Sequence, residues 1–515
     1  MHRTLTIRLA LSLALGLQFL PSRAAVGAET LLADAAEKAD WSRVRSLLKD
    51  HADVSAAQAD GSTALEWAAY HDRLDIAGQL LDAGADAKGA NRYGVTPLSL
   101  ACTNGDAPLV QALLKAGADP NTAIRPTGET VLMTASRTGK VDAVRLLIDA
   151  GAQVDATDRK GQTALMWAAD EDHADTIVLL TQSGANIHAR LKSGFTPMLF
   201  AVRDGRINAV RALLKLGVDA NEAIEPPAKK DGTPAKNVTP ALTLAIENGH
   251  YELGLELLKA GANPNDQRSG YTPLHTLTWA RKPNRGDDPD GQPPPTGSGN
   301  ITSLQFARLL VEHGADVNTR LTKGPAGRGK LGMTGATAFL MASKTADLPY
   351  MQLLIELGAD PLIPNKDGCT PLMAAAGIGT LAPDEEAGTE DEALAAVDYL
   401  LRKGADINTV DKNGETAMHG AAYKSLPKMV EFLAGRGAKV DAWNHKDKYG
   451  WTPLLIAQGF RPGNFKPSEE TVEAIEKVMR AAGVDPPLPP ARSTTNPAGH
   501  DDSVPNRNSA TAPAR

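Results

Sequence analysis

The chain has 515 residues, a formal net charge of −7 at neutral pH and a hydrophobic fraction of 42%. This charge balance provides no global positive field, so it excludes a protein that attracts nucleic acid or anionic lipid through its overall charge. No C-x-x-C, H-E-x-x-H, G-x-S-x-G or Walker A pattern is present. The sequence therefore predicts no catalytic residue, no cofactor site and no metal site.

The first 28 residues have the pattern of a secretory signal peptide. Arg3 and Arg8 supply positive charge, Leu9 to Leu20 is apolar, and small residues precede and include Ala28. Signal peptidase reads small residues of this kind, and about a dozen apolar residues are too few for a comfortable membrane anchor. We expect cleavage near Ala28 and an exported chain without membrane insertion, periplasmic or extracellular. A buried N-terminal helix is the alternative.

The stretch Gly128 to Asp158 predicts the unit from which the rest of the chain is built. Thr130 can cap a short helix that ends at Gly139. Gly151 follows a second helix, where a residue without a Cβ best adopts the left-handed closing conformation. Apolar residues recur at helical spacing on one face of this second helix: Val141, Val144, Leu147 and Ile148. Two such helices cannot form a core alone, so they need copies of themselves.

Threonine and glycine mark eleven copies of this unit. The opening threonines are Thr63, Thr96, Thr130, Thr163, Thr196, Thr239, Thr272, Thr337, Thr370, Thr416 and Thr452. The closing glycines are Gly84, Gly117, Gly151, Gly184, Gly217, Gly261, Gly314, Gly358, Gly404, Gly437 and Gly483. Where nothing is inserted, the period is 33 or 34 residues, and Thr272-Pro273-Leu274-His275 matches the opening T-P-L-H.

The chain therefore resembles the ankyrin-repeat family, as an exported bacterial member, over residues 29–484. The resemblance implies an all-α solenoid of helix–turn–helix repeats with projecting hairpin fingers. A divergent first unit near residues 29–60 and a polar last helix near residues 469–482 suit terminal caps, which gives twelve repeats. Residues 485–515 are rich in proline and polar residues, and we expect a disordered tail there.

Long insertions interrupt the second half of the predicted array. From the threonine to the glycine of one unit the distance is 21 residues in units two to six, whereas several later units are longer, such as 42 residues from Thr272 to Gly314. The insertions lie near residues 225–237, 281–300, 320–335, 378–392 and 461–468. We expect surface loops, which in solenoids often mark a binding side, although neutral tolerance of long loops is an equal alternative.

Seven residues are candidate contacts for a protein partner. Three aromatic residues lie at fingertips, just before an opening threonine: Phe195, Tyr271 and Trp451. Four basic residues lie in the lengthened fingers: Lys229, Lys230, Arg328 and Lys330. The resemblance implies exposed fingertips, and aromatic residues are common interface anchors. Packing between adjacent fingers is the alternative for the aromatic residues.

Other conspicuous residues are predicted to be structural. The two cysteines, Cys102 and Cys369, fall in the third and tenth units and are expected to be unpaired. His275 and His419 occupy the motif position, where the resemblance implies bonding to backbone. Bulky residues four after the threonine are expected to pack between neighbouring units: Trp67, Leu100, Trp167, Phe200, Met341 and Ile456.

The sequence predicts a monomeric, non-catalytic scaffold of the cell envelope that binds an unidentified protein partner through its fingers and concave face. An accessory protein that stabilises an envelope enzyme is the alternative. A weaker alternative is a hydrolase that uses the acidic insertion, where Glu385 and Glu392 would have to be paired.

Overall fold

The computed structural model describes residues 30–225, 238–284, 293–324, 330–383, 386–461 and 467–489. The predicted signal peptide and the predicted tail from residue 490 onward lie outside these residues. So do three of the candidate partner contacts, namely Lys229, Lys230 and Arg328. The chain divides after Asn186 into two compact units, called unit 1 and unit 2 below.

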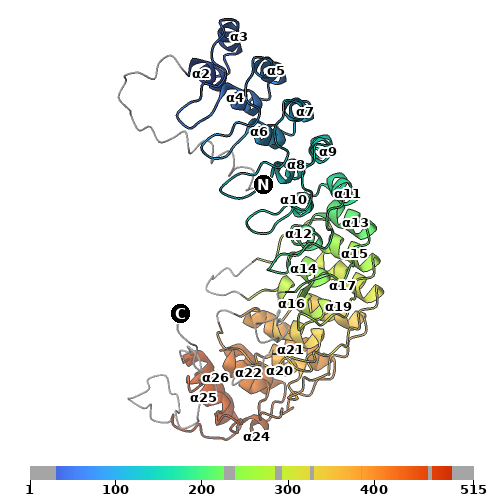
Figure 1. Ribbon diagram of the computed structural model, residues 1–515. Helices are drawn as coiled ribbons and strands as arrows, with labels where there is room; N and C mark the ends of the chain where they lie inside the picture. The colour runs from blue at the N-terminus through green and yellow to red at the C-terminus, as the bar shows by residue number, and fades with distance from the viewer. Residues whose placement is uncertain are drawn as a thin grey trace, which may run out of the picture. The chain divides into compact units, whose positions relative to one another are not determined.

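Unit 1 consists of five helix pairs in its described residues (Figure 1). They are α2 (Leu31–Glu37) with α3 (Trp41–Lys49), α4 (Ala64–Tyr70) with α5 (Leu74–Asp82), α6 (Pro97–Asn104) with α7 (Ala107–Lys115), α8 (Val131–Thr138) with α9 (Val141–Asp149), and α10 (Ala164–Asp170) with α11 (Ala174–Gln182).

Unit 2 contains seven helix pairs, one additional short helix and one small sheet in its described residues. The pairs are α12 (Pro197–Arg203) with α13 (Ile207–Lys215), α14 (Ala241–Glu247) with α15 (Tyr251–Lys259), α16 (Pro273–Arg281) with α17 (Ser303–Glu312), α18 (Ala338–Lys344) with α19 (Leu348–Glu356), α20 (Pro371–Ala375) with α21 (Glu390–Arg402), α22 (Ala417–Tyr423) with α23 (Pro427–Gly435), and α25 (Pro453–Ala457) with α26 (Glu469–Ala481). The additional helix is α24 (Val440–Trp443), and the sheet pairs β1 (Ala223–Ile224) with β2 (Thr239–Pro240).

The all-α architecture and the twelve helix pairs confirm the predicted fold class. Local capping chemistry explains where the helices begin and end. In α8 the Thr130 hydroxyl accepts a hydrogen bond from the Met133 N–H at 3.3 Å, and Gly139 ends the helix at φ 69°. Gly151 follows α9 at φ 92°, a conformation that glycine adopts without the steric cost of a Cβ.

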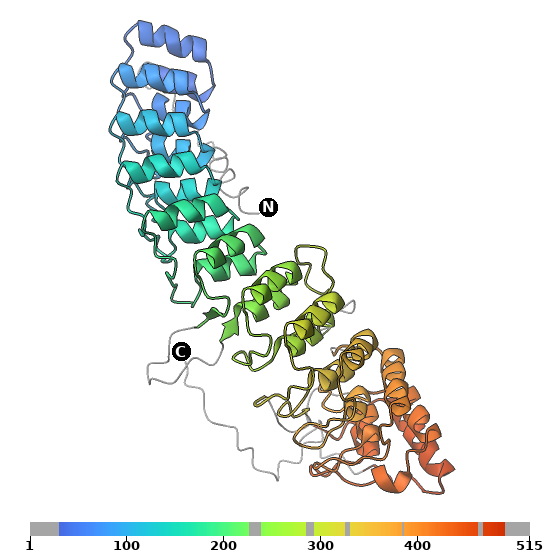
Figure 2. The same ribbon diagram turned by 90° about the vertical axis from the view of Figure 1, so that its right-hand side faces the viewer.

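The first helices of successive pairs pack against one another and form an inner layer within each unit (Figure 1). The second helices form an outer layer, whose elongated stack in unit 1 is seen side-on in Figure 2. Between the layers lies the core, where Val144 and Leu147 of α9 are completely buried. Each pair thus buries its apolar faces against its neighbours, as the repeat pattern requires.

An asparagine ladder ties neighbouring repeats together along the finger bases of unit 2. Asn221 donates from Nδ2 to the Gly261 carbonyl at 3.1 Å, and its Oδ1 accepts from the Asn263 N–H at 2.8 Å. Three further asparagines of unit 2 make the same double contact to the next repeat, namely Asn265, Asn318 and Asn408. The ladder falls four residues after a closing glycine, and the sequence analysis did not identify it.

The first lengthened finger changes the start of the following helix. Thr239 was predicted to open a repeat like the other threonines, but it lies in β2 and pairs with Ile224. Pro240 is the N-cap of α14 instead. The helix therefore begins one residue later than predicted, because the finger closes as a two-stranded antiparallel sheet.

The other described insertions are partly built into the fold, which differs from the expected surface loops. Leu331 and Met333 of the predicted 320–335 insertion are 5% and 8% exposed. Ser298 reaches back over 48 residues, and its N–H donates to His250 Nδ1 at 3.0 Å. The acidic insertion ends early, because Glu390 already begins α21. Among the residues described, no helix is both long enough and apolar enough to cross a membrane.

Candidate protein-binding surface

Two of the predicted fingertip aromatic residues, Phe195 and Tyr271, contact rings that follow them in the chain. Phe195 is half-buried, with its ring centroid 5.2 Å from that of Phe200 on α12. The guanidinium of Arg203 lies 5.5 Å from the Phe195 ring centroid. Packing of Phe195 therefore occurs within its own repeat and leaves part of the ring accessible.

Trp451 is only 9% exposed, so the expectation of an exposed fingertip is wrong for this residue. The backbone N–H of Trp451 donates to the Asp447 carboxylate at 2.9 Å, and the centroid of its ring lies 5.4 Å from that of Tyr449. The short turn at this fingertip folds the indole inward, because the Asp447 N–H also bonds the Trp451 carbonyl at 2.8 Å. Little of this ring is available to a partner.

Of the four basic candidates, only Lys330 belongs to the described residues, and it is exposed. The neighbouring Leu331 is buried. A side chain added to Gly379 would meet the Leu331 nitrogen at 2.3 Å, so this part of the finger lies directly against the segment after α20. The lengthened finger thus holds Lys330 at its surface on a packed base.

The acidic insertion is held by lysines and by helix capping. Glu386 forms an ion pair with Lys344 at 2.7 Å. Glu392 pairs with Lys282 at 2.7 Å and accepts from the Thr389 N–H at 2.8 Å, which completes a capping box for α21. Glu385, its partner in the hydrolase alternative, lies outside the described residues. The known contacts of Glu392 are therefore those of a structural carboxylate.

The motif histidines are buried and neutral. In His275, Nδ1 lies 2.6 Å from the Thr272 hydroxyl and Nε2 lies 3.1 Å from the Ala336 carbonyl. Burial lowers the pKa of His275 to about 4 and that of His419 to about 3. Bonding of His275 to backbone confirms its predicted structural role. Both cysteines are free, as predicted. They are also buried, and this burial raises their pKa.

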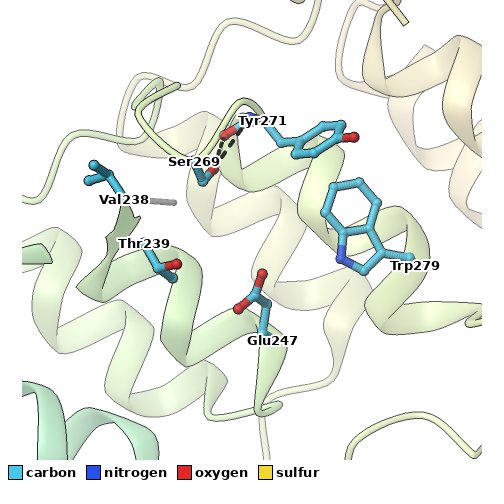
Figure 3. A pocket seen from close by; sticks show the side chains of 6 residues that line it. All are labelled: Val238, Thr239, Glu247, Ser269, Tyr271 and Trp279. Atoms are coloured by element: carbon cyan, nitrogen blue, oxygen red, sulfur yellow. Dashed lines mark hydrogen bonds between the residues drawn. The ribbon is translucent and has the colours of Figure 1, made fainter. Parts of the chain in front are cut away.

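Tyr271 lines a hollow of about 450 Å³ in unit 2 (Figure 3). The lining residues are Val238, Thr239, Glu247, Ser269, Tyr271 and Trp279. The rings of Tyr271 and Trp279 meet edge to face, with centroids 4.6 Å apart and planes at 73°. In Figure 3 the Glu247 carboxylate, at the end of α14, points toward the space beside Trp279. The hollow thus combines two aromatic rings with one carboxylate.

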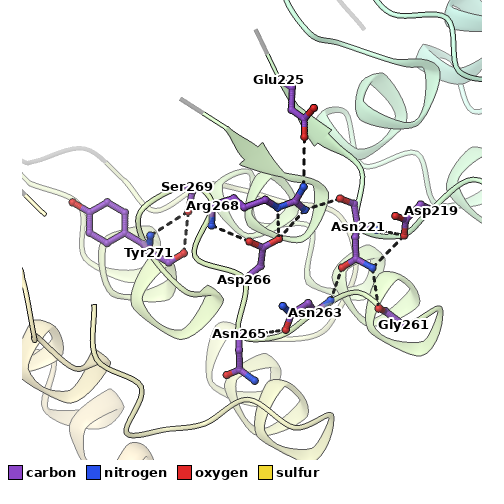
Figure 4. Close-up of polar contacts among 10 residues, drawn as sticks. All are labelled: Asp219, Asn221, Glu225, Gly261, Asn263, Asn265, Asp266, Arg268, Ser269 and Tyr271. Atoms are coloured by element: carbon purple, nitrogen blue, oxygen red, sulfur yellow. Dashed lines mark hydrogen bonds and ion pairs between the residues drawn. The ribbon is translucent and has the colours of Figure 1, made fainter. Parts of the chain in front are cut away.

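A polar network fixes the finger that carries Tyr271 (Figure 4). Ser269 donates to the Tyr271 carbonyl at 2.9 Å and accepts from its N–H at 3.3 Å. Arg268 forms an ion pair with Asp266 at 2.8 Å and donates to the Asn221 carbonyl at 2.7 Å. Because these bonds join the finger to the preceding one, they fix the backbone that carries the Tyr271 ring.

The sequence analysis missed Trp279 and Glu247. Trp279 lies seven residues after the N-cap Thr272, and Glu247 lies seven residues after the N-cap Pro240. The two therefore occupy equivalent positions on α16 and α14. Counting from the threonine alone hides this equivalence, because the N-cap of α14 is shifted by one residue.

The six bulky residues four after the threonine divide into two groups. Phe200, Met341 and Ile456 are 6%, 7% and 2% exposed, which confirms their predicted packing role. The other three, Trp67, Leu100 and Trp167, are half-buried. The indole of Trp67 donates to Gln58 Oε1 at 2.7 Å, so it is also fixed by a finger residue.

A family model described as ankyrin repeats (3 copies) matches residues 32–124, 98–191, 160–224, 183–268 and 387–466. These matches cover more than half of the chain. The chain belongs to the ankyrin-repeat family. Ankyrin repeats indicate a scaffold for protein–protein interaction, which is the coarse function predicted from the sequence.

Relatives of this ankyrin-repeat protein carry different names. Human ankyrin repeat and SOCS box protein 6 is 33% identical over 247 residues, which cover 47% of each chain. Phosphocholine transferase AnkX of Legionella pneumophila is 26% identical over 252 residues, or 45% of this chain and 24% of AnkX. A crystal structure of the human ASB11 ankyrin repeat domain aligns with a TM-score of 0.39 and 22% identity, covering 45% of this chain and 98% of that one. The matches span less than half the length of these curated relatives.

Proposed function

We propose that this ankyrin-repeat protein is an exported, non-catalytic scaffold of the cell envelope that binds a protein partner through its fingers and inner-helix face. The observation that carries the proposal is the ordered finger base. In unit 2, Asn221, Asn265 and Asn318 each bond the following repeat through both ends of the amide. A surface fixed in this way loses little conformational entropy on binding, which favours association.

Export is supported by the first 28 residues, with their basic start, apolar run and small residues before Glu29. Mass spectrometry of the protein from the envelope fraction should find a mature terminus at or near Glu29. An intact Met1 terminus in that fraction would contradict the export part of the proposal and leave the scaffold part standing.

Affinity capture followed by reconstitution tests the scaffold. The chain is used as bait for envelope extract, and each captured protein is purified and titrated against the chain. Saturable one-to-one binding supports the proposal, whereas capture that fails to reproduce with purified components contradicts it.

The accessory role is tested with the same pair of proteins. If the partner is an enzyme, its inactivation half-life should lengthen in the presence of the chain. Turnover of substrate by the purified chain alone would contradict the non-catalytic part.

A further inference from the structure

The Glu247 carboxylate in the hollow of unit 2 lacks a partner among the described residues, which supply no hydrogen bond or ion pair to it. It is open to solvent, yet the surrounding protein atoms raise the pKa of its carboxyl above the ordinary value. Glu247 is also the last residue of α14, where the helix dipole places negative charge. Both effects disfavour the lone carboxylate, and a bound cation would compensate both.

The aromatic walls of the hollow favour the same class of ligand. Tyr271 and Trp279 are both half-buried, so each keeps part of its ring accessible. A cation near the face of a tyrosine or tryptophan ring is attracted by the negative charge of the π-system. The edge-to-face arrangement at 73° means that the two rings offer differently oriented surfaces to a planar group.

Among the residues that the structure describes, Glu247 is the sole charged residue that lines the hollow. The basic residue of the finger that carries Tyr271, Arg268, is already paired with Asp266 at 2.8 Å and lies 3.6 Å from Glu225. Its guanidinium is therefore committed to the finger network shown in Figure 4. An incoming basic group would meet an uncompensated carboxylate.

We infer that this hollow binds an arginine side chain of the protein partner, an inference that rests on the proposed scaffold function. A guanidinium is planar, donates two parallel hydrogen bonds to a carboxylate and stacks on aromatic rings. Glu247 accepts these hydrogen bonds, while Tyr271 and Trp279 contact the guanidinium plane and the methylene stem. The volume of about 450 Å³ accommodates one such side chain with the adjoining backbone.

The test is a titration of the full chain with acetyl-Gly-Arg-Gly-amide, followed through the indole N–H signal of Trp279 in tryptophan-labelled protein. We expect a saturable shift of that signal. Acetyl-Gly-citrulline-Gly-amide has nearly the same shape without the charge, and it should bind about tenfold more weakly or not at all. Equal shifts with both peptides would overturn the assignment of a cation site, as would the absence of a shift with the arginine peptide.

Two variants separate the carboxylate from general effects of charge. Glu247→Gln should weaken the arginine peptide about tenfold, because it removes the charge and one acceptor. Glu312→Gln is the matched control, since Glu312 is likewise the last residue of a helix in unit 2 and is exposed. Equal weakening in both variants would show a nonspecific effect of net charge and overturn the inference.

Two competing occupants are distinguished in the same experiment. If the corresponding lysine peptide binds more strongly than the arginine peptide, the hollow is a site for an ammonium group and the inference of an arginine ligand is wrong. The lysines that precede Val238, namely Lys229, Lys230 and Lys236, supply the other candidate. If replacing all three by serine shifts the Trp279 signal without peptide, the chain occupies its own hollow and the inference is wrong.

The outcome is separable from that of the scaffold proposal. If a partner binds the parent chain and the Glu247→Gln variant equally, the arginine contact is wrong but the scaffold proposal still stands. Conversely, peptide binding at the hollow without any reproducible protein partner would preserve the arginine site and remove the scaffold.

Discussion

The ion pair between Arg281 and Asp347 should be the most sensitive single contact among the charged residues of unit 2. Arg281 ends α16, and its Nε and Nη2 reach the two Asp347 oxygens at 2.7 and 3.0 Å. The side chains are 14% and 3% exposed. Arg281 also donates from Nη1 to the Ser303 hydroxyl at 2.6 Å. One guanidinium therefore joins α16, α17 and the start of α19.

The magnitude follows from what each substitution leaves behind. Arg281→Met should destabilise the surrounding repeats by about 3 kcal/mol, because a nearly buried carboxylate loses its bidentate partner. Asp347→Ala should cost about 1 kcal/mol more, since Asp347 is also the N-cap of α19 and accepts from the Tyr350 N–H at 3.3 Å. Asp347→Ser keeps a capping oxygen, so its combination with Arg281→Met should cost about 2 kcal/mol less than the sum of the two single changes.

Hydrogen exchange measured by mass spectrometry is the appropriate assay, because a repeat array need not unfold in one step. A loss of about 3 kcal/mol corresponds to exchange accelerated on the order of a hundredfold in peptides from α16 to α19. Peptides from unit 1, such as α4 and α5, should be unaffected. Equal acceleration in both units would refute nearest-neighbour stability.

Arg308 and Glu356 provide the matched control in the same unit. Their contact of 2.5 Å is as short as that of the buried pair, but the side chains are 49% and 59% exposed. Arg308→Met should therefore cost no more than about 1 kcal/mol, because solvent screens an exposed pair. A cost at Arg281 equal to that at Arg308 would refute the assignment of the difference to burial.

Three further predictions address the backbone, the ladder and pH. Gly151→Val should lower the free energy of local unfolding by about 1 kcal/mol or more through φ 92° alone, since no atom lies within 4 Å of an added Cβ. Gly435→Ala, in the helical backbone of α23, should instead raise that free energy by about 0.5 to 1 kcal/mol. The urea midpoint of local hydrogen exchange measures both changes. Asn318→Ala should lower local stability by about 1 to 2 kcal/mol, because it removes the hydrogen bonds to Gly358 and Asp360. Hydrogen exchange should then be faster at the end of α19, and an unchanged rate would show that the ladder does not contribute to stability. His250 Nδ1 accepts a hydrogen bond from the Ser298 N–H, and burial lowers the pKa of His250. The contribution of neutral His250 to the stability of unit 2 should therefore be complete above the ordinary histidine pKa of about 6.5 and be lost as pH falls below that value. His250→Gln should flatten this pH dependence in melting curves, and an unaltered slope would contradict the prediction.

The sequence predicted the repeats well because their determinants are local. Thr130 and Gly151 act on backbone within a few residues, so the same residue types recur wherever a helix begins or ends. The ladder was equally local in sequence, four residues after a glycine, yet it was missed because its bonds run to the next repeat. Asn221, for example, reaches Gly261 across 40 residues.

The insertions were less predictable because their contacts are distant in the chain. Ser298 bonds His250 across 48 residues, and Arg461 donates to the Thr380 carbonyl across 81 residues at 3.0 Å. Composition shows that such segments are polar, but it does not show which atoms they meet. Only the structure reveals that Leu331 is buried within a finger rich in glycine and lysine.

The candidate site shows the same division between local rules and distant contacts. The rule that an aromatic residue precedes the opening threonine identified Tyr271, but the same rule selected Trp451, which is buried. In the proposed site, a fingertip contributes to binding because the adjacent inner helices leave a space beside it. At Tyr271, that space exists because α14 and α16 present Glu247 and Trp279 from equivalent positions on consecutive repeats. If the proposed site is correct, specificity in such an array comes from which residues successive repeats place at one position, while the caps and glycines keep that position constant.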